Sequence, residues 1–383
     1  MSSEQFRVLV IEELTACGVT WAGAVESMRQ EAVAMVQTVL QDLQQVPGCQ
    51  PQVLLSPAVA DLWRELNLLP TGVMVLQNAT DVGCWLQQAA ELGPECDSVL
   101  LIAPESEGLL ERRLQQLNFG HWRNISSINC SAQMAALFAD KHQTAIWLQE
   151  QGIPAVPGVV VTHAVQQQLL ALQEHSWSAE SPVSVRAVTG SAAESASVIK
   201  PRFGVGCGEI QWLRQQFAAV ELLGDAAAGA EGEWLLQPFL DGIFCSAAIV
   251  GRQDGQRLIL PAGEQRISWQ NRRPVYLGGS IPAEPPVGQA VEAVMQRIAL
   301  ALPAFAGWIG VDFVVSRPDG GELQIRVMEV NPRLCTSFVG YHRACDSSLL
   351  GWILAESAAV AAVNVPQFPH AVRFLADGSV LSG

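Results

Sequence analysis

Two polar side chains stand out in an apolar stretch near the end of the chain, RVMEVNPR at residues 326–333. Successive side chains of a β-strand point to opposite faces, so Glu329 and Asn331 lie on the same face of an expected strand. The preceding apolar stretch, WIGVDFVVS, is joined to this one through RPDGGE. If the two glycines at residues 320–321 form a two-residue hairpin turn, Asp312 lies directly opposite Glu329.

These three residues have the chemistry of a cation site. Two facing carboxylates repel each other and destabilise a sheet unless a positive charge lies between them. The carboxylates of Asp312 and Glu329 and the amide oxygen of Asn331 are hard ligands that suit Mg²⁺, or Mn²⁺ in its place, with phosphates completing the shell. Pro332 cannot donate to a strand ladder, so pairing ends there and leaves the cluster at a rim. A surface hairpin with ordinary polar residues is the alternative, although the apolar neighbours favour burial.

A glycine-rich segment, SVIKPRFGVGCGEI, could supply the phosphate contacts. Lys200 ends an apolar stretch, and a loop with Gly204, Gly206 and Gly208 follows. Glycine lets backbone N–H groups close over phosphate oxygens, and lysine adds a point charge. The lysine precedes the glycines, so this is not a Walker A loop, and a glycine-rich hairpin turn would give the same pattern.

Two further segments could take part in binding a nucleotide. The stretch EWLLQPFLDG runs as an apolar strand into Pro238, and the turn beyond it leaves backbone groups of residues 237–240 free for an adenine edge. Lys141 lies in FADKHQ within an expected helix, where a lone lysine is usually solvated.

The N-terminal region must provide a framework for this constellation. Apolar stretches of strand length, FRVLVIEEL, PQVLLS, GVMVLQ and SVLLIAP, alternate with segments of helical spacing at residues 22–46 and 81–92. The first helical segment places five apolar residues on one side: Met28, Ala32, Met35, Val36 and Val39. Such alternation predicts an open parallel α/β sheet over about the first 125 residues. No GxGxxG follows the first strand, so a dinucleotide site there is disfavoured.

The rest of the chain has a different organisation. Ser131 is expected to cap a helix that runs to Gly152, with Pro154 as its stop. From residue 198 onward most stretches read as strands in hairpins, so the expected fold class is α/β followed by α+β with antiparallel sheets in a two-lobed domain. The expected boundaries give an N-terminal α/β domain at 1–127, connecting helices and a polar loop (189–197) at 128–197, a lobe with glycine loop and hinge at 198–242, a lobe with the metal site at 243–363 and a loosely held tail at 364–383.

Composition limits the classes of function open to this chain of 383 residues. Apolar residues make up 49% and charged residues 15%, which suits a globular protein with much buried surface. The formal net charge of -15 argues against a nucleic-acid partner, and no apolar stretch qualifies as a membrane span. Nine cysteines without CxxC spacing and an N-terminus without a secretion-signal pattern lead us to expect free thiols and a cytoplasmic location.

The order of these motifs resembles that of the ATP-grasp superfamily over roughly residues 128–350. The motifs are a lysine in a helix, a lysine before a glycine loop, a strand and hinge, an acidic strand, and E-x-N-P-R on its neighbour. The resemblance implies a preceding α/β domain, ATP with Mg²⁺ as cofactors, and a role for each matching residue. The implied nucleotide contacts are Lys141 and Lys200 at the phosphates, Gly204, Gly206 and Gly208 over the β and γ groups, and Gln237, Phe239 and Leu240 at the adenine.

The same resemblance implies roles at the reacting groups. Asp312, Glu329 and Asn331 would bind the magnesium ions, and Lys200 and Arg333 would be catalytic, with Arg333 stabilising the acyl phosphate or the tetrahedral species. The implied substrate contacts are Arg333, Thr336, Ser337 and Arg266. Phe244 falls near the place where many members carry an acid for the ribose, so Asp241 is the substitute, and Gly310 replaces an arginine whose charge Arg266 would supply.

A narrower likeness, carried by IEELTACG, ADKHQTAIWLQEQGIPAVP and MEVNPRLCTSFVG among others, is to the tyramine–glutamate ligase branch of methanofuran-type cofactor synthesis. It implies a carboxylate–amine ligase that acts through an acyl phosphate on two small-molecule substrates; a homodimer is left open. Glu12 and Glu105, at expected strand ends, are candidates for the general base. The alternatives are an ATP-dependent carboxylase or carbamoyl-phosphate-type enzyme that uses bicarbonate, and a non-catalytic nucleotide-binding module.

Overall fold

A computed structural model describes residues 5–77, 96–174, 196–206, 209–213, 233–317, 320–355 and 363–381. These residues build one parallel and two antiparallel sheets, which confirms the expected combination of α/β and α+β architecture. The helix expected at 81–92 and most of the loop expected at 189–197 lie outside the described residues.

The N-terminal sheet, sheet A, is parallel and has the strand order β3-β2-β1-β4-β5. All four predicted apolar stretches form strands in it, and only β3, at the edge, is largely uncovered. The chain continues from β1 to β2 and β3 on one side, and then crosses to β4 and β5 on the other side of β1. The carboxyl ends of β1 and β4 therefore border the crevice where open α/β sheets bind ligands. The strands are β1 (Phe6–Glu12), β2 (Cys49–Leu55), β3 (Met74–Gln77), β4 (Ser98–Ile102) and β5 (Ser126–Ser127).

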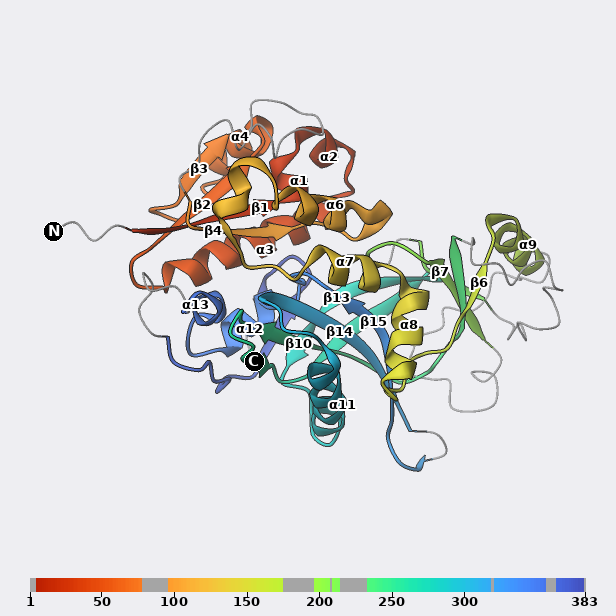
Figure 1. The fold of residues 1–383 in the computed structure, drawn as a ribbon. Coiled ribbons are helices and arrows are strands. Elements are labelled where there is room, and N and C mark those ends of the chain that lie inside the picture. The colour runs from red at the N-terminus through yellow and green to blue at the C-terminus, as the bar shows by residue number, and fades with distance from the viewer. Residues whose placement is uncertain are drawn as a thin grey trace.

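Helices cover both faces of sheet A (Figure 1). They are α1 (Glu13–Ala16), α2 (Gly18–Gly23), α3 (Glu26–Gln44), α4 (Pro57–Glu65) and α6 (Leu109–Gln116), with 3-10 turns η1 (Ser106–Gly108) and η2 (Gly120–Asn124). Helix α3 buries Ala32, Met35, Val36 and Val39, as its spacing predicted. Met28 was wrongly assigned to this face: it is 41% exposed, because the first turn of α3 extends beyond the packed layer.

The helix expected from Ser131 to Gly152 is two helices, α7 (Ala132–Ala139) and α8 (Lys141–Glu150). Ser131 caps the first as predicted, because its side chain accepts a hydrogen bond from the Met134 N–H. The backbone of Asp140 is extended, and its carboxylate accepts from the first N–H groups of α8. Asp140 therefore ends one helix by capping the next.

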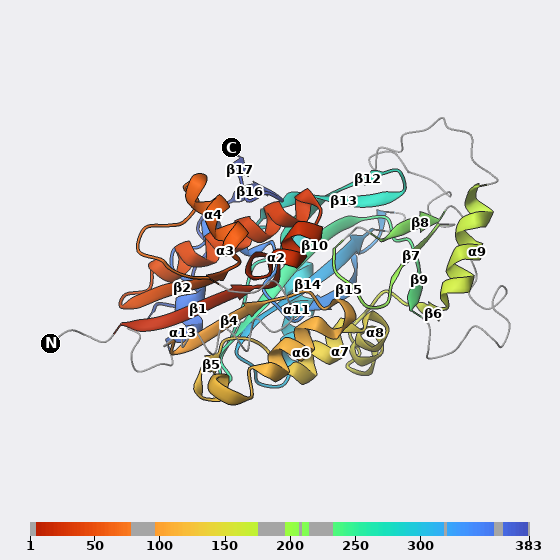
Figure 2. The ribbon, with the colours of Figure 1, turned by 90° about the horizontal axis from the view of Figure 1, so that it is seen from above.

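Sheet C is antiparallel, with the order β6-β9-β7-β8, and forms one end of the molecule with α9 on its outer side (Figures 1 and 2). Sheet B is larger, with the order β15-β14-β10-β12-β13-β16-β17 and with β11 paired to β10. The elements of sheet C are β6 (Val159–Val161), α9 (His163–Glu174), β7 (Ser197–Pro201), β8 (Gln211–Leu213) and β9 (Trp234–Pro238). The elements at sheet B are β10 (Ile243–Gly251), β11 (Arg257–Ile259), β12 (Gly263–Gln270), β13 (Arg273–Ile281), α11 (Val287–Ala301), β14 (Gly307–Ser316), β15 (Gln324–Asn331), α12 (Phe338–Ala344), α13 (Leu349–Leu354), β16 (Val372–Leu375) and β17 (Val380–Leu381).

Two parts of sheet B differ from the sequence expectations. The β12–β13 hairpin was missed, because polar residues interrupt its apolar pattern. The C-terminal tail was wrongly expected to be loosely held: β16 pairs with β13 and buries Val372 and Phe374, so local alternation was enough to make a strand.

The hairpin of β14 and β15 has the predicted pairing of Asp312 with Glu329. The predicted two-residue turn is wrong, since the strands end at Ser316 and Gln324. A bulge beside Phe313 gives β15 one extra residue. The extra residue shifts the pairing by one position, so that Asp312 pairs with Glu329 as predicted although the turn differs.

Sheets A and B share hydrophobic cores, and one buried polar joint connects them. Asp42 of α3 is fully buried and accepts hydrogen bonds from the N–H groups of Leu349 (3.3 Å) and Leu350 (2.9 Å) and from the Ser348 hydroxyl (2.7 Å). Nδ1 of His342 lies 2.9 Å from the same carboxylate. Helices α12 and α13 are thereby attached to the N-terminal domain.

Membrane spans and cysteines can be described for the ranges given above. No helix in those ranges is long and apolar enough to cross a membrane. The seven cysteines within those ranges are all free thiols, as expected.

Candidate active site

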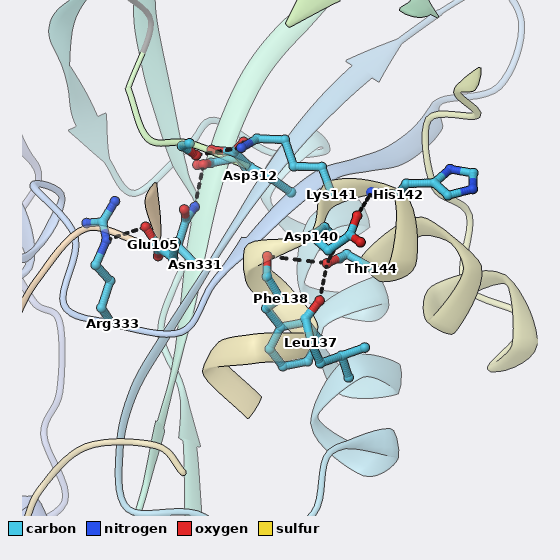
Figure 3. Close-up of polar contacts among 12 residues, drawn as sticks. Glu105, Leu137, Phe138, Asp140, Lys141, His142, Thr144, Asp312, Asn331 and Arg333 are labelled. Atoms are coloured by element: carbon cyan, nitrogen blue, oxygen red, sulfur yellow. Dashed lines mark hydrogen bonds and ion pairs between the residues drawn. The ribbon is translucent and has the colours of Figure 1, made fainter. Parts of the chain in front are cut away.

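Asp312 and Glu329 face each other across β14 and β15, and the neighbouring Asn331 points to the same cluster (Figure 3). Nδ2 of Asn331 donates to Asp312 Oδ2 at 2.9 Å, and Nε2 of Gln265 donates to Asp312 Oδ1 at 2.8 Å. Burial, and then repulsion from Glu329, raise the pKa of Asp312 to about 7. The raised pKa of Asp312 therefore reflects its burial and also the repulsion between two facing carboxylates.

Two lysines approach this cluster from other elements. Nζ of Lys141, at the start of α8, lies 3.8 Å from Glu329 Oε2 and donates to the Gly204 carbonyl at 2.5 Å. Lys200 of β7 is 6% exposed, and burial lowers its pKa to about 8 although Glu329 acts in the opposite direction. Burial would raise the pKa of Glu329, but both lysines act against it and the pKa lies below its ordinary value. Cations brought this close to each other favour a bound anion.

A buried ion pair that the sequence analysis missed fixes the first lysine. Arg202, directly after β7, donates from Nε to Asp140 Oδ1 at 2.9 Å and from Nη2 to Oδ2 at 2.7 Å. The Lys141 N–H also donates to the Arg202 carbonyl at 3.2 Å. Because Asp140 caps α8, this fork attaches the start of α8 to the end of β7 and places both lysines together.

The glycine loop lies beside this fork. Gly204 (φ 154°) and Gly206 (φ 71°) adopt backbone conformations that other residues rarely take, so glycine is required at both positions. The Gly204 carbonyl is occupied by Lys141 in this structure. Gly208, the third predicted contact, lies outside the described residues.

The expected adenine hinge directly follows β9, an inner strand of sheet C that pairs with β6 and β7. The Gln237 side chain is buried and donates to a main-chain carbonyl at 3.1 Å, while the N–H of Phe239 bonds to the Ala196 carbonyl at 3.0 Å. Among the described residues, no hydrogen bond occupies the backbone of Leu240, which leaves this position available to a ligand. Asp241 is exposed.

Arg333 forms an ion pair across the interface of the two domains. Its Nε donates to Oε2 of Glu105 at 2.9 Å, and its Nη1 donates to the Leu334 carbonyl at 3.1 Å (Figure 3). Burial opposes the charge of Arg333, but the Glu105 carboxylate keeps its pKa above the ordinary value. The guanidinium is therefore a fixed positive charge at the rim where β15 ends.

The remaining predicted substrate contacts lie in different places. The Thr336 hydroxyl donates to Glu31 Oε2 of α3 at 3.0 Å, and Ser337 stands at the start of α12. Arg266 is exposed on β12 and does not join the acids. Its neighbour Gln265 makes the contact with Asp312 instead, because adjacent residues of a strand point to opposite faces.

The two candidates for a general base, Glu12 and Glu105, differ in their contacts and in their position. Both oxygens of Glu12 accept from N–H groups of α1, those of Leu14 (3.1 Å) and Thr15 (2.8 Å), and burial raises its pKa to about 7. Glu105 instead lines a small pocket with Lys141 and Glu329. Glu12 is thus a buried cap, and only Glu105 faces the cluster.

The donor set also limits how a metal could bind. Within the described ranges, no group of three or more His, Cys, Asp and Glu side chains could hold a metal ion. Asp312 and Glu329 would therefore need Asn331 and non-protein oxygens to complete a shell. Mg²⁺ is commonly held in this way, by one or two carboxylates together with substrate phosphates. The residues present thus fit Mg²⁺ bound with a nucleotide.

Comparisons with solved structures show where this fold occurs. A protein from Archaeoglobus fulgidus ascribed to the ATP-grasp superfamily has a TM-score of 0.60 and 19% identity, over 96% of this chain and 92% of that chain. N5-carboxyaminoimidazole synthetase from Staphylococcus aureus has a TM-score of 0.59 and 15% identity, over 97% and 83%. Biotin carboxylase from Campylobacter jejuni, in a β-γ-ATP complex, has a TM-score of 0.61 and 14% identity, over 97% and 76%.

A comparison with curated protein sequences found no match to the chain. A comparison with family models is more specific than the likeness in fold. The model described as the ATP-grasp domain matches residues 138–337, more than half of the chain. That range includes both lysines, the facing acids and Arg333. The chain therefore belongs to the ATP-grasp family.

Proposed function

We propose that this protein is an ATP-dependent ligase that joins a carboxylate to an amine and releases ADP and phosphate. The observation that carries the proposal is the meeting of Lys141 and Lys200 with the facing acids Asp312 and Glu329 beside the fixed charge of Arg333. Four separate elements, α8, β7, β14 and β15 with the segment directly after it, deliver these groups to one place. Phosphoryl transfer depends mainly on such positioning and charge stabilisation.

In this proposal the nucleotide lies between sheets B and C. The lysines and the loop with Gly204 and Gly206 contact the phosphates, and the free backbone of Leu240 contacts the adenine. The acids and Asn331 hold Mg²⁺, which neutralises negative charge on the phosphates when it is bound. The raised pKa of Asp312 supports this role, because two buried carboxylates without a cation repel each other.

The reaction then has two steps. A carboxylate oxygen attacks the γ-phosphorus of ATP, the bond to the bridging oxygen breaks, and ADP leaves with that electron pair. The amine nitrogen next attacks the acyl carbon, and phosphate leaves as the carbon–oxygen bond breaks. Arg333 stabilises the oxyanion formed in this second step through its positive charge, which the contact with Glu105 holds in place.

Substrates are proposed on narrower grounds. The motifs that resemble the tyramine–glutamate ligase branch favour glutamate and an amine such as tyramine as the substrates, in a methanofuran-like pathway. The alternative that uses bicarbonate has its own support, since two of the similar structures are described as N5-carboxyaminoimidazole synthetase and biotin carboxylase. A non-catalytic module is the weakest alternative, because all three presumed metal ligands, Asp312, Glu329 and Asn331, are present.

The test is ADP release by the purified protein with Mg-ATP. L-glutamate is offered with a panel of amines that includes tyramine, then other carboxylates with the same amines, and finally bicarbonate alone. Asp312→Asn is expected to abolish the release, whereas the matched surface change Asp61→Asn leaves it unchanged, because Asp61 lies on α4 and contacts Arg64.

Release that requires both a carboxylate and an amine would establish the ligase. Release with bicarbonate in the absence of any other carboxylate would refute it in favour of the carboxylase. Retention of full activity in Asp312→Asn would overturn the assignment of the acids.

A further inference from the structure

Glu105 has one carboxylate oxygen without a partner. The residue is 3% exposed, and its Oε2 accepts from Arg333 Nε. Among the described residues, its Oε1 is buried and has no hydrogen-bond partner. A buried acceptor left unsatisfied in this way costs free energy, and such atoms usually serve a ligand or a catalytic role.

The position of Glu105 relates this oxygen to the reacting groups. Glu105 follows β4 at the crevice between the carboxyl ends of β1 and β4. It lines the same small pocket as Lys141, Glu329 and Asn331 (Figure 3). The charged groups that face it are Arg333 beyond β15, Lys141 on α8 and Glu329 on β15.

The chemistry of the free oxygen selects among the proposed reactants. An ionised carboxylate only accepts hydrogen bonds, and it repels other anions. The phosphate groups of ATP and of the acyl phosphate, and the reacting carboxylate itself, bring negative charge and no N–H group to this oxygen. The amine brings N–H donors and a proton that must leave before the amide is complete. Glu105 therefore suits the second substrate.

The other acids near the site do not offer the same function. Both oxygens of Glu12 already accept from α1, and Glu31 accepts from Thr336 at a separate place on α3. Glu329 is engaged with Lys141 and faces Asp312. Only Glu105, within the described residues, combines a position in the pocket with an unpaired and buried oxygen.

We propose that Glu105 is the acid that binds the attacking amine and takes its proton, so that the protein selects amines as nucleophiles. This assignment rests on the ligase function proposed above. As the nitrogen lone pair forms the bond to the acyl carbon, the bond from that carbon to the phosphate oxygen breaks. One N–H proton moves to the free Oε1, and the other oxygen keeps Arg333 in place.

The test separates the amine from the earlier step by changing the nucleophile. Hydroxylamine is largely uncharged at neutral pH and captures an acyl phosphate as a hydroxamate without help from a base. The assay compares amide formation with tyramine and hydroxamate formation with hydroxylamine, using Mg-ATP and L-glutamate, or whichever carboxylate supports ADP release. The proteins are the full chain and its variants Glu105→Gln, Glu105→Asp and Glu12→Gln.

For Glu105→Gln we expect kcat for the amide to fall about 100-fold, the usual lower range for loss of a general base. Hydroxamate formation should stay within about threefold of the unchanged protein, because the glutamine oxygen can still accept from Arg333. Glu105→Asp should recover part of the amide rate. Glu12→Gln should leave the ratio of the two rates unchanged, because Glu12 does not reach the pocket.

Two results would overturn the assignment of Glu105. One is an equal fall of amide and hydroxamate rates in a folded variant, which would mean that Glu105 acts through Arg333 or on the first substrate, and not on the amine. The other is an unchanged amide rate. A different failure belongs to the proposed function itself: if the unchanged protein gives no hydroxamate with any carboxylate, no acyl phosphate forms and the ligase is refuted.

Discussion

Glu12 provides a prediction whose size follows from its surroundings. The side chain is buried, and burial raises its pKa from 4.5 to about 7 although two backbone N–H groups donate to it. In the unfolded chain the carboxyl ionises with its ordinary pKa. Between these two pKa values the folded protein binds a proton that the unfolded chain has lost, so the free energy of unfolding falls as the pH rises through this range. Each pH unit contributes about 1.4 kcal/mol, so the full effect is about 3 kcal/mol.

The variant Glu12→Gln removes this titration. Between pH 5 and pH 8 we expect the stability of the variant, relative to the unchanged protein, to rise by about 2 to 3 kcal/mol. A constant offset of about 1 kcal/mol is expected at all pH values, because glutamine has one acceptor oxygen where the carboxylate uses two. Other titrating groups are common to both proteins and cancel in the difference.

Urea denaturation of both proteins at several pH values measures this difference directly. Stability curves that run parallel from pH 5 to pH 8 would refute the reasoning, because they would show that Glu12 has the same pKa in the folded and unfolded chains. A difference with the opposite slope would mean that the N–H donors of α1 outweigh burial.

Three further predictions concern the site. Glu329→Gln should reduce turnover at least about 100-fold with an unchanged circular dichroism spectrum, because the charge that holds the cation is lost; normal turnover would contradict the metal assignment. Lys200→Ala should weaken ATP binding at least about 10-fold in calorimetry, since it removes a buried charge that we propose to contact the phosphates; equal affinity would exclude that role. Arg202→Met should lower the free energy of unfolding by about 3 kcal/mol, because Asp140 stays buried without its partner. Arg64→Met, which breaks a surface ion pair, should change it by less than about 1 kcal/mol in the same denaturation series.

Local sequence patterns were enough to predict part of the site. Asp312 and Glu329 belong to adjacent strands, so the alternation of side chains and a short connection bring them together. The pairing was correct even though the turn was longer than expected, because the bulge beside Phe313 compensated for it. Lys200 was singled out as a charge ahead of a glycine loop, a pattern that a hairpin turn would also give. Lys141 received a role only when the order of motifs was compared with a family, because the physical properties of a lone lysine do not predict its position.

Long-range contacts explain what the sequence could not show. Glu105 and Arg333 are 228 positions apart and meet only because two domains pack against each other. The break at Asp140 is another example, since the apolar spacing continues through it and the ion pair with Arg202 is invisible in the local pattern. The buried strand at Val372 carried a usable signal, because apolar residues alternate with a charged one there.

The Asp42 joint has a consequence for how the site can move. It fixes helices α12 and α13 to α3, so sheets A and B form one mechanical unit. Glu105 follows a strand of sheet A and Arg333 follows a strand of sheet B, so a joint outside the pocket helps to keep these two residues together. Sheet C, which carries Lys200, is not held by this joint and is attached instead through the pair of Arg202 with Asp140. The acids and Arg333 thus lie in the part of the structure that the Asp42 joint holds together, and Lys200 reaches them from a separate sheet.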